Sequence, residues 1–268
     1  MRMFHIGVTL GGGSIIKSIL LFILCLLGFA IVHFIKLMRM YLIVMEQHIP
    51  FKRFLPAYLR TTFVNLIIPY KLGEIYRIAV FSRITEGINV GFFSVLVDRF
   101  FDTLALIIML LPFILLSGKT VSVPVVLLTI FLLIILFAYI MFPSAYGYLN
   151  HYIITSRDSK NSMAALKGLE KVNEWYMYVK RLVSGRYGIL FLFSLAAWAF
   201  ELVVLVGLAA LFGAEFGADM FGDYISSILS ANSIGISRVY TIYSAIVILI
   251  ATVIFTTIYL TDKGRKKS

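Results

Sequence analysis

Two long stretches of the chain contain no charged residue at all. Val121–Phe142 and Val239–Thr261 are continuous apolar runs. Each is long enough to cross the hydrocarbon core of a bilayer, which takes about 20 residues in a helix. Inside a bilayer every backbone polar group must find its hydrogen bond within the protein, and a helix satisfies these groups by itself. The sequence therefore predicts an all-α membrane protein.

Three further apolar stretches predict more membrane-spanning helices. Ser18–Ile35 is too long for the core of a signal peptide. Tyr187–Ala214 is interrupted only by Glu201, and Phe92–Leu116 carries three charges in its first half. The composition agrees, because 61% of the residues are hydrophobic and only 14% are charged, against about 25% charged in soluble domains. We expect residues 1–268 to form one transmembrane domain, a polytopic helix bundle of about five spans.

One apolar stretch, Leu55–Phe81, is broken and also carries charges. A proline inside a helix removes a backbone hydrogen bond and bends the chain. Broken segments at membrane depth occur only where they are buried in protein or line a wet cavity. We expect residues 55–81 to form a re-entrant helix–turn–helix, and residues 218–237 are the candidate for a second one. The residues that interrupt the first segment are Pro56, Pro69 and Gly73.

Basic residues concentrate in three stretches, 36–60, 143–186 and 261–268, whereas residues 213–237 contain no Lys or Arg. Because basic residues collect in cytoplasmic loops and tails, this pattern predicts an external amino terminus and a cytoplasmic carboxyl terminus. Residues 55–81 then enter and leave the membrane on the cytoplasmic side. The net charge of +11 follows from this topology and does not point to nucleic acid.

The cytoplasmic loop at 143–186 contains an amphipathic helix. Two interpretations of its apolar face are open: it contacts the membrane surface and its anionic lipid headgroups, or it packs on the helix bundle. The apolar positions recur every three to four residues, at Met163, Leu166, Leu169, Val172, Trp175, Tyr176, Val179 and Leu182.

Motifs typical of soluble enzymes are missing from the sequence. The four histidines are scattered, and the single cysteine, Cys25, can form no internal disulfide. Gly11–Ser14 does not begin a phosphate-binding loop, because Ile16 rather than a glycine precedes Lys17. No Asp-x-Asp motif for a sugar nucleotide is present. We therefore expect no metal, no cofactor and no catalytic residue.

The functional signal is a group of charges inside apolar segments. Such a charge costs about 2.5–3.5 kcal/mol on insertion scales, so it is usually paired or functional. The group is either a salt-bridge network that holds the hairpin to the bundle, or a polar cavity, open to the cytoplasm, that binds a phosphate headgroup through Arg. Helical spacing places Glu74 beside Arg77 and Asp98 beside Asp102. The six charges are Lys71, Glu74, Arg77, Asp98, Arg99 and Asp102.

Two segments in the middle of the chain resemble the transmembrane domain of the lysylphosphatidylglycerol synthase/flippase family. The first is Asn65-Leu-Ile-Ile-Pro69-Tyr-Lys-Leu-Gly73-Glu74-Ile-Tyr-Arg77, and the second is Ser94-Val-Leu-Val-Asp98-Arg99-Phe-Phe-Asp102. The basic pair Lys36 and Arg39 resembles the element before this core. Ser194-Leu-Ala-Ala-Trp198-x-x-Glu201 is similar to a later signature of the family.

The sequence also departs from this family at two places. Asp98 stands where the family usually has Glu. The late glycine-rich element survives only as residues 231–238, with Gly235 retained and Arg238 where an acid is expected. The soluble aminoacyl-transferase domain of the full-length synthases is not found after the last span, so we do not expect lysine transfer to lipid.

The resemblance implies a multi-pass protein of the cell membrane (the cytoplasmic or inner membrane) that moves or presents lipids with polar heads. Arg77 and Arg99 would bind phosphate, and three carboxylates would orient them or bind a sugar or amine. The expected headgroup site comprises Arg77, Glu74, Arg99, Asp102, Asp98, Lys71 and Asn65, with Pro69 and Gly73 breaking the helix. Trp198 and Glu201 are secondary candidates.

Three functions therefore remain open. The first is a translocase for a modified phospholipid or a polyprenyl-linked sugar. The second is a non-transporting component of glycolipid or cell-envelope assembly, which presents a lipid carrier to a glycosyltransferase. The third is a scaffold in which the charges are only structural. Expected partners are the lipid or lipid-linked sugar, anionic headgroups at the cytoplasmic face, and a glycosyltransferase or a second copy of the chain.

Overall fold

The computed structural model describes residues 15–68, 72–85, 87–117, 123–155, 160–213, 217, 221, 224–225 and 236–265. These residues confirm the all-α class, since no strand occurs among them. The long helices are α1 (Ile15–Val44), α4 (Ile88–Ser117), α5 (Val123–Thr155), α7 (Tyr187–Leu211) and α9 (Ile236–Arg265). The others are η1 (Met45–Gln47), α2 (Phe51–Ile67), α3 (Leu72–Ile84) and α6 (Lys160–Val183).

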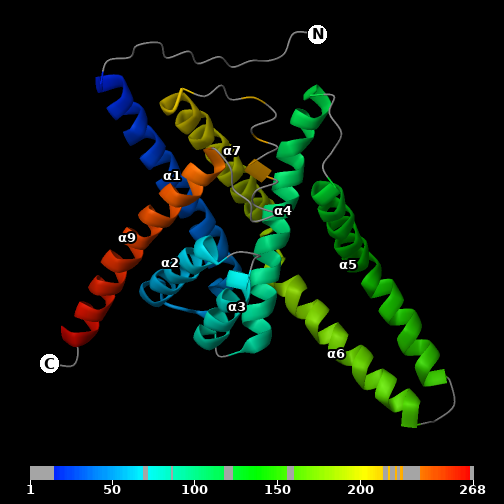
Figure 1. Cartoon of the computed structure of the whole chain (residues 1–268). Coiled ribbons are helices and arrows are strands. Elements are labelled where there is room, and N and C mark those ends of the chain that lie inside the picture. Colours follow the sequence, from blue (N-terminus) through cyan, green and yellow to red (C-terminus); the bar gives the residue numbers. More distant parts are fainter. Residues whose placement is uncertain are drawn as a thin grey trace.

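Four described helices are long and apolar enough to cross a membrane: Ile19–Gln47, Val125–Thr155, Tyr187–Leu211 and Val239–Ile258. The fifth expected span coincides with α4, which carries its charges in the first half. Figure 1 shows that α1, α4, α5, α7 and α9 alternate in direction along the chain. This alternation agrees with the expected topology, although the number of spans and their orientation stay predictions.

The first helix is longer than the sequence indicated. The expected span ended at Ile35, but α1 continues to Val44. Lys36 and Arg39 therefore lie within the helix, and the side chain of Arg39 is fully buried. Both residues thus lie in a helix rather than in a loop, and their assignment to the cytoplasmic side stays a prediction. The helix continues because residues 37–44 are themselves mostly apolar and because carboxylates of other helices compensate the two charges.

Residues 55–81 form the expected helix–turn–helix, made of α2 and α3. Pro56 does not break α2, which runs through it. Gly73 lies in the first turn of α3, where a Cβ atom would be only 2.5 Å from the Cα of Asn65. This glycine therefore allows the two helices to approach closely. Pro69 and Lys71 lie outside the described residues, and membrane re-entry of the hairpin stays a prediction.

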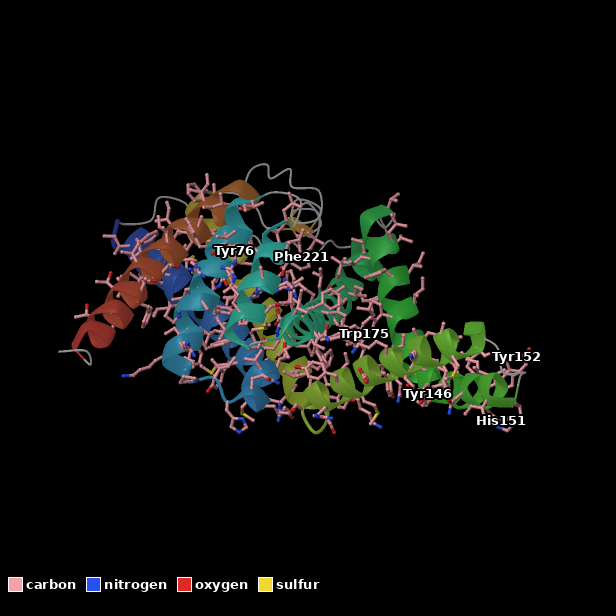
Figure 2. All side chains as sticks on the ribbon, turned by 90° about the horizontal axis from the view of Figure 1, so that it is seen from below. Tyr76, Tyr146, His151, Tyr152, Trp175 and Phe221 are labelled. Carbon is pink, nitrogen blue, oxygen red and sulfur yellow. The ribbon has the colours of Figure 1, made fainter. Side chains whose placement is uncertain are left out.

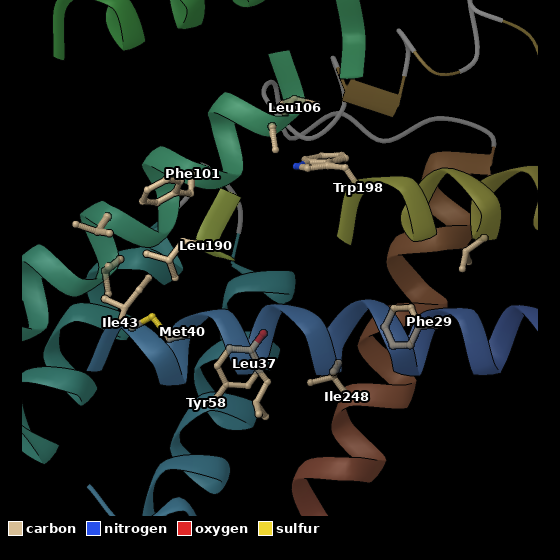
Figure 3. Close-up of a cluster of buried hydrophobic side chains, with 14 of the residues drawn as sticks. Phe29, Leu37, Met40, Ile43, Tyr58, Phe101, Leu106, Leu190, Trp198 and Ile248 are labelled. Atoms are coloured by element: carbon tan, nitrogen blue, oxygen red, sulfur yellow. The ribbon is translucent and has the colours of Figure 1, made fainter. Parts of the chain in front are cut away.

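The most extensive helix pair is α1 with α7. Small residues bring the two helices together, because a Cβ at Gly28 would be 2.7 Å from Val204 Cγ2 and one at Gly207 would be 2.7 Å from Cys25 Sγ. Side chains from α1, α2, α4, α7 and α9 share the core beside this pair (Figure 3). The α2–α3 hairpin packs on α9 and α4, so α4 lies between the hairpin and the α1–α7 pair.

The second half of α5 and α6 form an α5–α6 arm, residues 139–155 and 160–183, which extends away from the hairpin that carries Tyr76 (Figures 1 and 2). The ring of Tyr176 lies 4.8 Å from that of Phe142, and Trp175 contacts Phe93 of α4. Thus the carboxyl-terminal part of α6 packs on the bundle, and the contact of the rest of its apolar face stays open. Met163 nevertheless stays exposed, and contact with anionic headgroups stays a prediction.

Most of the candidate for a second re-entrant segment, residues 218–237, lies outside the described residues. The same holds for residues 266–268 of the basic tail, while α9 continues through Arg265. Neither the second hairpin nor the cytoplasmic position of the tail is tested by the structure, and both stay predictions.

Candidate functional site

Arg39 is the centre of a buried ion-pair network between three helices. From α1, its Nε lies 2.8 Å from Asp98 Oδ1 and its Nη1 lies 2.9 Å from Asp102 Oδ1. The same Nη1 donates a hydrogen bond of 2.8 Å to Ser194 Oγ on α7. Asp98 and Asp102 are four residues apart on α4, so both point to the same side of that helix. These contacts form the inner layer of the network.

An outer layer joins the hairpin to α4. Asp98 Oδ2 lies 2.7 Å from Arg99 Nη2 and 3.5 Å from Arg77 Nη1. Glu74 Oε1 accepts a hydrogen bond of 2.9 Å from Asn65 Nδ2 and lies 3.5 Å from Arg99 Nη1. Glu74 and Arg77 are 3.9 Å apart across one turn of α3. Asp98 therefore contacts three guanidinium groups and connects the two layers.

The outer layer is the less complete of the two. Three of its buried atoms have no hydrogen-bond partner, compared with one atom of the inner layer, Arg39 Nη2. The three are Arg77 Nε, Arg99 Nε and Glu74 Oε2. The side chain of Arg99 is 37% exposed, compared with 4% for Arg77 and none for Arg39. Buried polar groups normally find partners. The outer layer thus offers unused donors, and an unused acceptor, beside the most accessible arginine of the network.

A second ion pair continues the network along α1 and α7. Lys36 Nζ lies 2.6 Å from Glu201 Oε2, and the hydroxyl of Tyr224 donates to Glu201 Oε1. The Lys36 ammonium also lies 5.5 Å from the centre of the Trp198 ring. Trp198 Nε1 donates a hydrogen bond of 3.0 Å to the backbone carbonyl of Asp102. Both secondary candidates, Trp198 and Glu201, are therefore connected to the main cluster.

The structure brings together six of the seven residues of the expected headgroup site, all except Lys71, which lies outside the described part of the chain. Sequence reasoning missed the role of two residues, Lys36 and Arg39. A signal was available, because these two cations are one helical turn apart in a segment that has no other charged residue from Ser18 to Val44. Their acidic partners, however, are 59 and 165 residues away.

The network offers charged groups that can bind an ionic ligand. It contains guanidinium, ammonium and carboxylate groups held by neighbours, and it lacks a pairing of nucleophile and base in the residues described. No three His, Cys, Asp or Glu side chains of the described residues could together hold a metal ion. Its most accessible part, at Arg99, can offer planar pairs of N–H donors to an oxyanion.

The sequence matches a known protein family. The family model described as the lysylphosphatidylglycerol synthase TM region matches residues 8–234. This range contains the hairpin, α4, α7 and every residue of the ion-pair network. No curated protein and no solved structure matches the sequence significantly.

Proposed function

Because the chain belongs to the lysylphosphatidylglycerol synthase transmembrane family, we propose that this multi-pass membrane protein translocates a lipid with a polar, phosphate-containing headgroup. The headgroup, from a modified phospholipid or a polyprenyl-linked sugar, binds at the outer layer of the network while its apolar chains stay in the bilayer. The protein acts in the cell membrane and needs no cofactor for this role.

The observation that carries the proposal is the incomplete outer layer. Arg77 and Arg99 bear buried Nε donors without partners, and a phosphate oxygen satisfies such donors through charge-assisted hydrogen bonds. Glu74 has a buried oxygen without a hydrogen-bond partner, which suits a hydroxyl or amine of the same headgroup. Asn65 holds the other oxygen of Glu74 and so fixes the direction of the carboxylate.

The inner layer has a different role in this proposal. Arg39 contacts Asp98 at 2.8 Å and Asp102 at 2.9 Å, and all three side chains have little or no exposure. Short, buried ion pairs hold geometry. We therefore assign them to holding α1 against α4, so that the outer arginines keep their positions while a headgroup binds and leaves.

The choice of variant matters for a test of this site. Exchanging the charges of Glu74 and Arg77 does not isolate a purely structural pair, because Arg77 also contacts Asp98 and Glu74 also contacts Arg99. The exchange places like charges against both neighbours. Arg99 is the better probe, because it is the most exposed member of the network and its loss disturbs packing least.

The test is lipid translocation in proteoliposomes that contain fluorescent phosphatidylglycerol, followed by chemical quenching of the outer leaflet. We expect Arg99→Gln to slow translocation by about tenfold or more, because a hydrogen bond to a charged group contributes roughly 1.5–3 kcal/mol. Arg53→Gln is the matched control, since Arg53 is an exposed arginine of α2. Equal rates for wild type and Arg99→Gln would show that the proposed site is wrong.

The second candidate function is presentation of a lipid carrier to a glycosyltransferase. The α5–α6 arm favours it, because the arm carries large exposed side chains, among them Tyr148 at 72% and Ile154 at 66% exposure, which a partner protein could cover. Co-purification of a transferase, together with no translocation by this chain alone, would support this function over transport.

A further inference from the structure

The ion-pair network is electrically neutral in the part of the chain that the structure describes. Its four cations are Lys36, Arg39, Arg77 and Arg99, and its four anions are Glu74, Asp98, Asp102 and Glu201. An anionic headgroup that binds there adds one negative charge to a set that is balanced among the described residues. Uncompensated charge in an apolar interior is costly and is usually removed by protonation. A proton that binds together with the anion would keep this set neutral.

We propose that Glu201 takes up one proton when an anionic headgroup binds at Arg77 and Arg99, so that the Lys36–Glu201 pair couples headgroup binding to proton binding. This inference rests on the proposed headgroup site, and it adds a second, separate site with a different ligand. The entering anion and the proton together leave the network neutral.

Glu201 is the carboxylate that depends on the fewest cations. Asp98 contacts three arginines, and Asp102 and Glu74 contact two each. Among the described residues Glu201 pairs with one cation, Lys36. Its other partners are neutral: Tyr240, through a side-chain hydrogen bond, and the hydroxyl of Tyr224. That hydroxyl can still donate to the carboxyl group after protonation. Release of one ammonium would therefore leave the Glu201 carboxylate with no cation beside it among the described residues.

Lys36 is positioned to leave Glu201 for Asp102. Its ammonium lies over the ring of Trp198, which is hydrogen-bonded to the backbone of Asp102. It is also within electrostatic reach of the Asp102 carboxylate. A phosphate that binds Arg99 competes with Asp102, whose Oδ2 lies only 3.5 Å from Arg99 Nη1. Asp102 then keeps Arg39 as its one arginine partner, and the Lys36 ammonium is a further cation within reach of its freed oxygen.

Other titratable groups surround the pair on each neighbouring element. His33 lies one turn before Lys36 on α1, and its buried Nδ1 has no hydrogen-bond partner. Tyr240 of α9 packs against the ring of Tyr224 with centroids 5.4 Å apart. The tyrosines stay neutral near neutral pH. His33 is therefore the competing proton acceptor that an experiment must separate from Glu201.

The experiment is calorimetric titration of the purified full chain with a short-chain phosphatidylglycerol, over a range of pH and in buffers of different protonation enthalpy. The phosphodiester keeps one negative charge throughout that range. We expect the wild type to take up about one proton per bound lipid, so that affinity falls by up to about tenfold per pH unit as pH rises. In Glu201→Gln this pH dependence is lost. Glu174→Gln, an exposed carboxylate of α6, keeps the wild-type behaviour.

Lys36→Gln provides a second variant, in which Glu201 lacks its cation before lipid binds and proton uptake is again lost. Binding without proton uptake in the wild type would overturn the coupling and leave the headgroup site intact. Uptake that persists in Glu201→Gln but disappears in His33→Gln would assign the proton to His33 and overturn the proposal. No binding in the wild type would remove the headgroup site itself, and the coupling with it.

Discussion

At the scale of single residues, Arg39 determines how the network is held together. Its guanidinium reaches Asp98 and Asp102 of α4 and Ser194 of α7, so one side chain connects three helices. Because it is fully buried, it is tolerated only through these partners. Removing one member of a buried ion pair leaves the other charge uncompensated, and that is more costly than the loss of an exposed pair.

Replacing Arg39 by Met should therefore lower the free energy of unfolding by about 3–5 kcal/mol. Thermal unfolding of the purified protein in detergent measures the effect. Arg39→Lys should recover only part of the lost stability. It restores the positive charge, but a single ammonium cannot contact all three acceptors that the guanidinium contacts. Arg53→Met on the exposed face of α2 is the control, with an expected change within about 0.5 kcal/mol. An Arg39→Met variant as stable as this control would contradict the central role of Arg39.

The candidate site could be predicted from sequence where its partners are close in the chain. Glu74 and Arg77, and likewise Asp98 and Asp102, share a helix face at spacings of three and four residues. Arg39 could not be assigned in this way, because two cations at the end of an apolar run suit a cytoplasmic loop equally well. Only the folded chain shows which carboxylates meet them.

At the scale of helices, two glycines set the position of the outer arginines. Gly73 allows α3 to contact Asn65 of α2, and Gly91 allows α4 to contact Ser82 of α3, where a Cβ would be 2.5 Å from the backbone nitrogen. In both cases the atom in the way belongs to the backbone, which cannot rotate away as a side chain could. The hairpin is thus fixed on both sides, and the distance between Arg77 and Asp98 follows from these two close contacts.

Gly73→Ala should force α2 and α3 apart and destabilise the protein by about 1–3 kcal/mol, the usual cost of overpacking. It should also weaken lipid translocation, because Glu74 moves with α3. Gly168→Ala in α6 is the matched control, since a Cβ there meets nothing within 4 Å and alanine favours a helix interior by about 0.5–1 kcal/mol. Thermal unfolding of the two variants should shift in opposite directions, and a shift in the same direction would contradict the close contact.

The apolar runs of the sequence predicted which helices form and in what order, but they did not predict where each helix begins and ends. The sequence predicted the α2–α3 hairpin from its prolines and charges, yet Pro56 lies inside α2. Tertiary packing against α9 and α3 compensates for the missing backbone donor, which local sequence cannot reveal. The extension of α1 to Val44 depends in the same way on acidic partners in α4 and α7.

At the scale of the whole molecule, the long helices alternate in direction (Figure 1), and the α6–α7 turn lies near the end of α1. Arg186 in this turn donates to the backbone carbonyl of Leu42 and lies 3.1 Å from Glu46. On the same side Tyr178 of α6 is partly buried, and burial together with nearby Glu46 raises its pKa to about 12. These contacts join the base of the arm to the end of α1 that we expect to be cytoplasmic.

The topology can be tested with single cysteines, because Cys25 is the only native one and is buried. In a Cys25→Ser background, Ser184→Cys lies just before α7 and Phe212→Cys just after it. The two ends of α7 are about 37 Å apart at 1.5 Å per residue, enough to separate the two membrane faces. A membrane-impermeant maleimide should label Phe212→Cys from outside and Ser184→Cys only after permeabilisation. The reverse pattern would invert the topology.

The order of the charges along the chain bears on how the protein is made. Arg39 leaves the ribosome 59 residues before Asp98, and Lys36 leaves it 165 residues before Glu201. At roughly 5–20 residues per second, Lys36 waits about 10–30 s for its partner. During that time α1 carries two cations without the acidic partners that they have in the folded chain. We therefore expect α1 to reach its final packing only after α4 and α7 have been made.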